Sequence, residues 1–445
     1  MLGTPVARSW PCGGWGRRRV AAVVGTVAGV AMALSACTSG QPSAAASGRP
    51  ASVPGMSCAW PTLASIQRSP TLASIQRSNI GVTDSGAFYW LQPVVAGADT
   101  RIVISGDYPD ARYASLAVYL PNGSPFTSNG VGSSLSDYRI AADPGSTNPW
   151  QRPAVPGGRF TVTIRSQVTP AQTNVLPMPR GTTSAHPGYL LYRVYLPAGG
   201  RPDRVPLPTL TIHDGQTTRR LPTCRDHDAP IPSPVRDPTP SGSPIPVPPQ
   251  LKFYKPAGGF TVNALLPNMD TAYGQAYFVR RPASSDVVVV TAKAPTFAPG
   301  SHPSPWPNPH TDMRYWSMCL ALGTSRLPTV VNTLPSGRTD YGCRADDATV
   351  RNAAGDYTYV IGAESQRAAI DRVPGVTFLP FATDQTTPVY VLLLRNTLVD
   401  PRFPHSTANV TQTDDPAATA AVMGAYYPRI AVCPLATLTT NGCER

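Results

Sequence analysis

The chain has 445 residues, a formal net charge of +12 and a hydrophobic content of 41%. This length can hold two ordinary domains, and the 52 prolines and 37 glycines favour short strands and turns over long helices. Beyond the N-terminal segment the arginines are scattered and no basic run occurs, which argues against a nucleic-acid partner.

Residues 1–36 have the pattern of a lipoprotein signal peptide. Arg8 and the arginines at 17–19 precede an apolar run, Val20–Leu34, that is shorter than the roughly 20 residues a spanning helix needs. The next residues, Leu34–Cys37 (LSAC), resemble the bacterial lipobox. This resemblance implies cleavage before Cys37 and acylation of Cys37, with several acyl chains holding the protein on a membrane. An ordinary signal peptide with a chance cysteine is the alternative.

Residues 37–57 are rich in Ser, Pro and Ala, which is typical of a flexible stalk between a membrane and a folded domain. Together with the lipobox, this segment predicts an exported protein that is lipid-anchored to the outer face of the cell membrane. The membrane is therefore the first expected partner.

Residues 58–224 are predicted to form a first β-sandwich domain. Its expected strands are short, rich in β-branched and aromatic residues, and bounded by Gly, Pro, Asp or Asn. They are residues 100–105, 113–119, 160–164 and 189–195.

Residues 225–250 are rich in Pro and Ser and have almost nothing to bury, so an extended linker is expected there. A second β-sandwich domain is predicted at residues 251–445, with strands at 286–291, 357–361 and 389–394. One short helix should follow near the end, with Asp415 as N-cap, Pro416 in the first helical position and residues 417–423 after it.

An internal duplication relates the two predicted domains. The motif D-x-R-Y-x-S occurs at residues 110–115 and again at 312–317. We also pair Asp137-Tyr138 with Asp340-Tyr341, and the Asp84 region with the Asp270 region. The sequence therefore predicts an all-β protein of two tandem, related antiparallel β-sandwich domains with a short C-terminal helix.

The start of the second domain has the pattern N-x-D-T-x-Y, formed by Asn268, Asp270, Thr271 and Tyr273. This pattern resembles the opening of an uncharacterised family of bacterial exported β-sandwich proteins. The resemblance implies the same fold class and carries no activity with it. The first domain departs from the pattern in the segment that begins at Asp84.

Six cysteines remain outside the signal peptide and the lipobox, and an even number in an exported chain indicates disulfides. Six cysteines allow 15 pairings. We expect Cys58–Cys224 to join the ends of the first domain, and Cys433–Cys443 to close a short C-terminal loop. The remaining pair is then Cys319–Cys343.

The duplicated motif is the best candidate for chemistry. If it lies on a strand, Asp110 and Arg112 share one face, as do Asp312 and Arg314, and the arginine could grip a carboxylate or hydroxyl of a ligand. The alternative is a structural role, which we favour because the motif occurs in both domains. Asp270 has the same two readings, a turn cap or a catalytic acid.

The second domain also has an insertion, residues 294–310, that the first lacks. Its Trp306 lies between two prolines, and His302 and His310 flank it. Such a loop could stack on a sugar or a partner protein through an aromatic tip, although a plain surface loop is the commoner outcome. The spacing of the histidines matches no known metal site, so neither a metal nor a cofactor is expected.

Two function classes remain. The sequence lacks a nucleophile elbow, a zinc-protease helix and a phosphate-binding loop, and its only glutamates are Glu364 and Glu444. This favours a lipid-anchored binding or interaction module of the cell envelope, with a glycan or a protein as partner. The alternative is an envelope hydrolase that uses aspartates of the second domain, and it requires Asp270, Arg314 and His302 to meet in one pocket.

Overall fold

A computed structural model describes residues 57–60, 79, 81–97, 99–151, 158–224, 251–259, 266–280, 285–324, 327–383, 388–440 and 442–443. The predicted signal peptide, Cys37, nearly all of the stalk and the linker 225–250 lie outside the described residues. The chain divides into two units, Met1–Pro50 and Ala51–Arg445, and the second unit contains the whole fold described below. No helix in the described ranges is long and apolar enough to cross a membrane.

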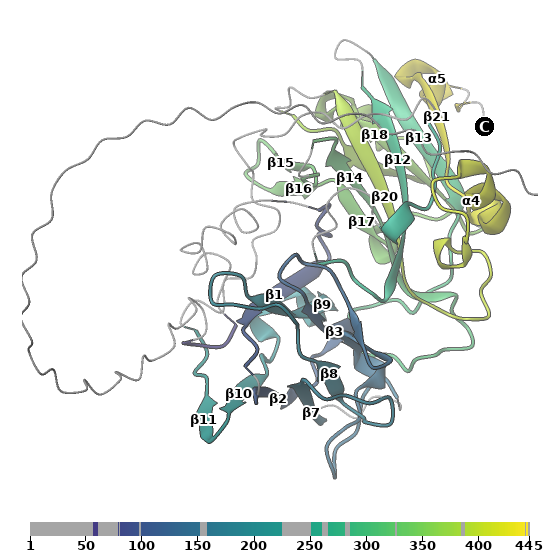
Figure 1. The fold of residues 1–445 in the computed structure, drawn as a ribbon. Helices are drawn as coiled ribbons and strands as arrows, with labels where there is room; N and C mark the ends of the chain where they lie inside the picture. Colours follow the sequence, from purple (N-terminus) through teal and green to yellow (C-terminus); the bar gives the residue numbers. More distant parts are fainter. Residues whose placement is uncertain are drawn as a thin grey trace, which may run out of the picture. The chain divides into compact units, whose positions relative to one another are not determined.

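Residues 58–224, here called copy 1, form two sheets (Figure 1). The first has the strand order β1-β9-β3-β6 and the second β11-β10-β2-β7-β8. The strands are β1 Ala87–Val94, β2 Arg101–Asp107, β3 Ala111–Tyr119, β6 Ser134–Ser136, β7 Arg159–Arg165, β8 Val175–Pro177, β9 Gly188–Pro197, β10 Thr209–Asp214 and β11 Thr217–Arg220, with a small hairpin of β4 Thr127–Ser128 and β5 Val131–Gly132.

Residues 251–445, here called copy 2, repeat this arrangement with sheets β12-β20-β14-β17 and β19-β18-β13-β21. The strands are β12 Thr271–Val279, β13 Asp286–Lys293, β14 Met313–Leu322, β17 Cys343–Ala345, β18 Asp356–Gly362, β19 Val376–Pro380, β20 Val389–Val399 and β21 Arg429–Pro434, with a hairpin of β15 Val331–Thr333 and β16 Thr339–Tyr341. The predicted all-β fold with related antiparallel sandwiches is confirmed. Only the edge pairs β7–β8 and β18–β19 are parallel among the described strand pairs.

Each copy has its own core between its two sheets. In copy 1, Leu116 and Leu190 of one sheet meet Ile104 and Val162 of the other. In copy 2, Trp316 and Leu392 belong to the corresponding cluster. In β2 and β7 buried side chains alternate with more exposed ones, as a strand with one buried face requires, whereas β3, β9, β14 and β20 are buried along nearly their whole length.

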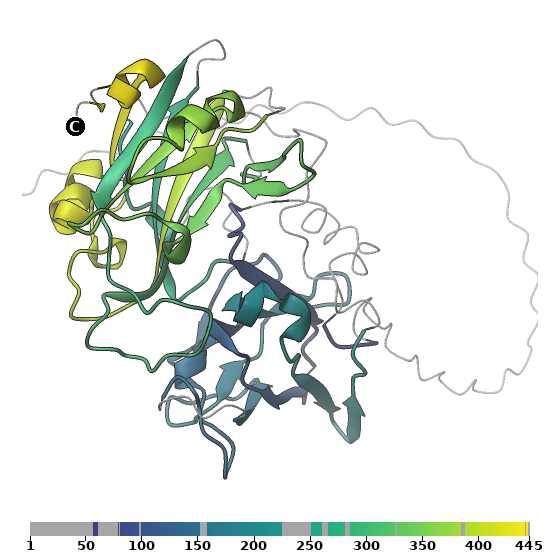
Figure 2. The ribbon, with the colours of Figure 1, turned by 180° about the vertical axis from the view of Figure 1, so that it is seen from behind.

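Three α-helices occur in the described part of copy 2, namely α3 Arg367–Ile370, α4 Pro416–Met423 and α5 Leu435–Thr440. The last two are yellow in Figures 1 and 2 and lie beside the sheets of copy 2. The predicted start of α4 is confirmed, since the Asp415 carboxylate accepts hydrogen bonds from the backbone N–H groups of Ala417 and Ala418.

The cysteines pair as Cys58–Cys224, Cys319–Cys343 and Cys433–Cys443, as the spacing predicts. The first bond joins the two ends of copy 1, where a bridge between Ala59 and Thr223 also lies. Three disulfides indicate an oxidising environment and therefore an exported chain.

Candidate functional site

The duplicated motif lies where the two copies meet. Residues of both copies form there one buried polar contact, which we call the seam. It consists of Asp84, Arg112, Tyr113, Asp137, Arg193, Asn268, Asp270, Arg314, Tyr315, Ser317, Asp346 and Arg395, with the atoms they bond.

The arginine of each motif pairs with an aspartate of the other copy. Arg112 on β3 donates to Asp346 and Asp347, and Arg314 on β14 donates to Asp137. Both arginine side chains are 1% exposed, and those of Asp346 and Asp137 are 0% and 1% exposed. The guanidinium groups therefore serve the contact between the copies and face no solvent in which a ligand could reach them.

The two aspartates occupy equivalent positions. Each begins a one-turn 3-10 helix after an edge strand, Asp137–Arg139 after β6 and Asp346–Ala348 after β17. Asp137 accepts a hydrogen bond from the backbone N–H of Ala114 on β3, and Asp346 from that of Trp316 on β14. Burial raises the pKa of Asp137 to about 6 and that of Asp346 to about 7, although Arg314 and Arg112 oppose the shift.

The tyrosines of the motif also reach the other copy. The Tyr315 hydroxyl donates to Asp84 at 2.9 Å, and Ser317 donates to the same carboxylate at 2.7 Å. The Tyr113 hydroxyl lies 3.0 Å from Asn268 Oδ1 and 2.8 Å from Asp270 Oδ2. Burial raises the pKa of both tyrosines well above the usual value, and the carboxylate of Asp270 adds to this shift for Tyr113 and that of Asp84 for Tyr315, so the hydroxyls stay protonated and donate.

A third reciprocal contact joins an arginine of each central strand to a backbone carbonyl of the other copy. Arg193 on β9 donates to Leu266 O at 2.9 Å, and Arg395 on β20 donates to Val82 O. Leu266 and Val82 both have positive φ, 55° and 52°. This conformation is strained for a branched side chain, and the arginine bond is one contact that holds it.

The reciprocal contacts correct two of our pairings between the copies. Asp84 corresponds to Asn268, not to Asp270, because each accepts the backbone N–H two residues on, from Gly86 and from Asp270 respectively. The register agrees, since Tyr89 pairs with Arg193 and Tyr273 with Arg395.

The counterpart of Asp137 is likewise Asp346. Asp340, which we had paired with it, lies on β16 and bonds to Arg344 and Arg367.

The insertion 294–310 folds against the seam, so the hypothesis of an exposed aromatic tip, the less favoured alternative to a plain surface loop, is wrong. Trp306 is 7% exposed, its backbone N–H donates to Trp150 O at 2.8 Å, and its ring lies 5.3 Å from the Arg314 guanidinium carbon. His302 is exposed and lies 2.8 Å from the exposed carboxylate of Asp110, and His310 is exposed as well.

Asp270, Arg314 and His302 do not form the pocket that the hydrolase hypothesis requires. Arg314 is fully buried on Asp137, Asp270 is half-buried on Tyr113 and Ser136, and His302 lies outside on Asp110. Asp110 and Arg112 are also separated, because Arg112 points into the seam while Asp110 is exposed. The motif residues thus take the structural role.

One group of potential metal ligands occurs among the described residues, formed by Asp84, Cys319 and Cys343. The two sulfurs form a disulfide, so neither is a thiolate ligand. Asp84 already accepts from Tyr315 and Ser317. This group does not fit a metal.

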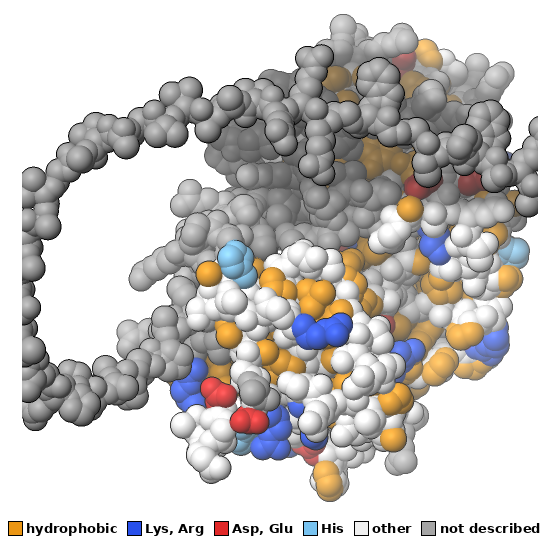
Figure 3. Space-filling view, viewed as in Figure 1, with side chains coloured by type: hydrophobic (Ala, Val, Ile, Leu, Met, Phe, Trp, Pro, Cys, Tyr) orange, Lys and Arg blue, Asp and Glu red, His pale blue; other side chains and the backbone are white. Residues whose placement is uncertain are grey.

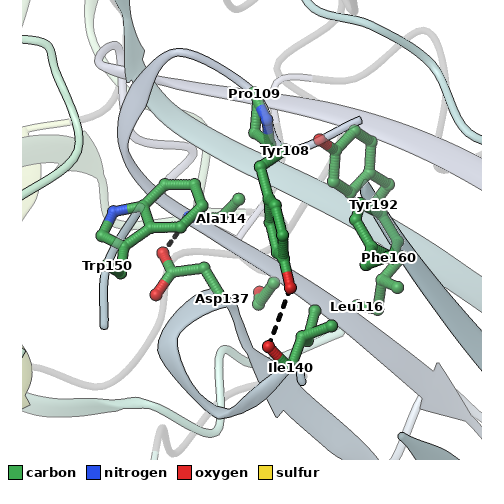
Figure 4. A pocket seen from close by; sticks show the side chains of 10 residues that line it. Tyr108, Pro109, Ala114, Leu116, Asp137, Ile140, Trp150, Phe160 and Tyr192 are labelled. Carbon is green, nitrogen blue, oxygen red and sulfur yellow. Dashed lines mark hydrogen bonds between the residues drawn. The ribbon is translucent and has the colours of Figure 1, made fainter. Parts of the chain in front are cut away.

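A small cavity lies beside Asp137, within copy 1 (Figure 4). Its volume is about 10 Å³, and its wall includes Tyr108, whose hydroxyl donates to Ile140 O at 2.8 Å. Such a volume suits one water molecule and no substrate. A larger, open groove of about 500 Å³ lies between α3 and α5 and contains none of the predicted site residues.

The surface adds no concentrated charge on the face that Figure 3 shows. Most Lys and Arg side chains are scattered over this face, and those at its lower left lie beside Asp or Glu side chains.

Sequence reasoning missed Asp346 and Asn268 as seam residues. A signal was present for Asp346, since Asp346-Asp347 follows a short strand just as Asp137 does. Asn268 was noted only as part of the N-x-D-T-x-Y pattern. Its role as the partner of Tyr113 depends on the other copy and has no local sequence signature.

No protein-family model and no curated protein matches this chain. Among solved structures, an uncharacterized protein from Burkholderia cenocepacia is similar at 14% identity with a TM-score of 0.44, over 81% of this chain and 79% of that one. An anti-sigma factor domain-containing protein is similar at 8% identity with a TM-score of 0.15, over 80% and 81% of the two chains. At these TM-scores neither likeness bears on function.

Proposed function

We propose that this chain is a lipoprotein of the cell envelope, anchored by a lipid on Cys37, and that its tandem sandwiches act as a non-catalytic binding or interaction module. The binding or interaction role is supported by where the side chains of the duplicated motif lie. Arg112, Arg314 and both motif tyrosines are bonded to the opposite copy and are buried.

A rigid two-copy body suits this role. The seam joins the copies by three kinds of reciprocal bond, so surfaces on both copies keep a fixed spacing. Binding to a fixed surface avoids the entropy cost of ordering flexible loops. The disulfides and the LSAC sequence support a position outside the cytoplasm, on a membrane.

The anchor is tested with the full-length chain in a bacterial host that processes lipoproteins. Cells are fed a palmitate analogue, and the chain is followed by labelling and by partition into a detergent phase. We expect label and detergent partition for the wild type and their loss in Cys37→Ser. Cys12→Ser is the matched control and should keep both, because residue 12 lies in the predicted signal peptide. An unlabelled wild-type chain in the aqueous phase would refute the anchor.

The hydrolase alternative is tested on the same purified chain with ester, glycoside and amide substrates of envelope type. The proposal expects no turnover that depends on Asp270. Turnover that disappears in Asp270→Asn, while the melting temperature is unchanged, would replace the binding module by an enzyme.

A further inference from the structure

Strand β21 is an edge strand whose outer side is open in the part of the chain that the structure describes. It pairs with β13 on one side only. Just beyond its end, the backbone N–H of Leu435 donates to Ser285 O, so the backbone polar groups of residue 435 face β13. In an antiparallel strand the N–H and C=O groups of successive residues face opposite sides of the strand. Those of Cys433 and Ala431 therefore also face β13, and those of Ile430 and Val432 face away from it.

Copy 1 shows what covers the same edge there. Its β10 is the counterpart of β21, since Ile212 pairs with Ile102 of the central strand as Val432 pairs with Val288. On the outer side of β10 lies the antiparallel strand β11, and Leu221 N–H continues this pairing by donating to Leu210 O at 2.9 Å.

The missing strand leaves an apolar side chain in solvent. Val432 is 51% exposed, whereas its counterpart Ile212 is 8% exposed. The chain after β21 turns into α5 and is tied back by Cys433–Cys443, so it adds no described strand to this edge. The edge of copy 1 differs again, because β11 is fully exposed and ends in Arg219 and Arg220, a charged pattern that discourages further pairing.

We infer that the β21 edge is a docking site for an extended segment of a partner protein, which adds to the sheet antiparallel to β21. Main-chain bonds to Ile430 and Val432 supply the recognition, and an apolar side chain of the added strand covers Val432. This inference rests on the proposed binding function and names its partner class as polypeptide.

The test measures amide hydrogen exchange at single residues of the full chain in detergent micelles. The probe is a soluble peptide with alternating valine and threonine and an acidic residue at each end. In the free protein, the amides of Ile430 and Val432 should exchange fast and that of Ala431 slowly. With the peptide at saturation, exchange at Ile430 and Val432 should slow at least about tenfold.

Three variants locate the effect. Val432→Pro removes the outward N–H but no bond to β13, and Val432→Lys places a charge on the edge, so both should lose the slowing. Val279→Lys is the matched control, since Val279 is 54% exposed on another strand, and it should bind as the wild type does. The melting temperature of each variant shows that it is folded.

Three results would overturn the inference. One is slow exchange at Ile430 and Val432 in the free protein at every concentration, which means that the edge is already covered. Another is slow exchange that depends on protein concentration, which assigns the edge to a second copy of the chain. The third is no slowing with the peptide, or equal slowing in Val432→Lys. None of these touches the anchoring and turnover tests, so the proposed function stands or fails separately.

Discussion

The two motif arginines have the same sequence context but not the same surroundings. All three side-chain nitrogens of Arg112 donate hydrogen bonds, to Gly300 O, Asp346 and Asp347. Arg314 donates through Nη1 to Asp137, and its Nε and Nη2 have no hydrogen-bond partner among the described residues. Its guanidinium lies near two rings, those of Tyr138 and Trp306, at 5.5 Å and 5.3 Å, whereas that of Arg112 lies near one, Phe297, at 5.5 Å.

The insertion of copy 2 causes much of this difference. It brings the Gly300 carbonyl to Arg112 and the Trp306 ring to Arg314, so a single segment serves both ends of the seam. A hydrogen-bonded guanidinium is the better satisfied of the two, because aromatic faces offset only part of the cost of burying donors. The duplication gave both copies the same motif arginine, and the insertion in copy 2 gives Arg112 and Arg314 different contacts and therefore different contributions to stability.

The largest expected effect comes from replacing Arg112, the motif arginine with more hydrogen bonds. Arg112→Met keeps the apolar volume but leaves Asp346 buried without its cation, and should lower the free energy of unfolding by about 3–5 kcal/mol. Arg314→Met also leaves a buried carboxylate, that of Asp137, without its cation, but fewer hydrogen bonds are lost, so its cost should lie at the lower end of this range. Chemical denaturation of the purified chain measures both.

Equal losses for the two variants, or a larger loss for Arg314→Met, would contradict the comparison. A double-mutant cycle with Asp346→Asn is the control. The coupling energy should be large for Arg112 with Asp346 and near zero for Arg314 with Asp346, because these last two do not pair.

The next effect concerns the ring that covers Arg314. Trp306→Ala removes a buried side chain and should cost about 3 kcal/mol. Trp306→Phe keeps a ring over the guanidinium and should cost about half as much. Thermal denaturation compares the two. A cost for Trp306→Ala below that of Trp306→Phe would mean that the ring does not cover the seam.

Local patterns predicted the cysteine pairs and seven strands (β2, β3, β7, β9, β13, β18 and β20), because these depend on alternation, turn residues and chain spacing, but they did not predict β1, β10 or β21. The strand predicted at 100–105 became β2, Arg101–Asp107, and that at 357–361 lies within β18. Contacts between the copies could not be predicted, because no local pattern of the sequence encodes them. Arg112 was expected beside Asp110 on one strand face, but it bonds to Asp346 of the other copy.

The errors in matching the copies also have a physical cause. Asp84 was aligned with Asp270 by residue type, whereas the structure conserves a turn in which Asp84 and Asn268 accept the same backbone bond. Asp and Asn can both make this turn, so matching identical residue types paired Asp84 with the wrong residue. Trp306 was misplaced because a proline-rich loop looks exposed in sequence, and only the seam provides the surface that buries it.

Acid should stabilise the seam. The pKa values of Asp137 and Asp346 are raised to about 6 and about 7 by burial, above the ordinary value of 3.8. The folded chain therefore binds more protons than the unfolded chain between about pH 4 and pH 7. The stability from these groups is full below pH 4 and is lost as the pH rises through 6 and 7.

The unfolding free energy should thus be higher at pH 5 than at pH 8, by on the order of 4 kcal/mol. Asp346→Asn should remove the upper part of this dependence and Asp137→Asn the lower part. Denaturation curves at a series of pH values measure it. A stability that rises from pH 5 to pH 8 in the wild type, or that falls as steeply in both variants, would show that burial does not control these carboxyls.

The smallest expected effect concerns the exposed contact of the insertion, that between His302 and Asp110. His302 lies 2.8 Å from Asp110, but the two side chains are 73% and 58% exposed, and such pairs gain little over their hydration. His302→Ala should change the unfolding free energy by less than about 0.5 kcal/mol, whereas Trp306→Ala, four residues on in the same segment, costs several times more. A change near that of Trp306→Ala, measured at one pH and salt concentration, would mean that the exposed pair also fixes the insertion on the seam. The contact between His302 and Asp110 would then contribute, like Gly300 and Trp306, to the difference between the two motif arginines.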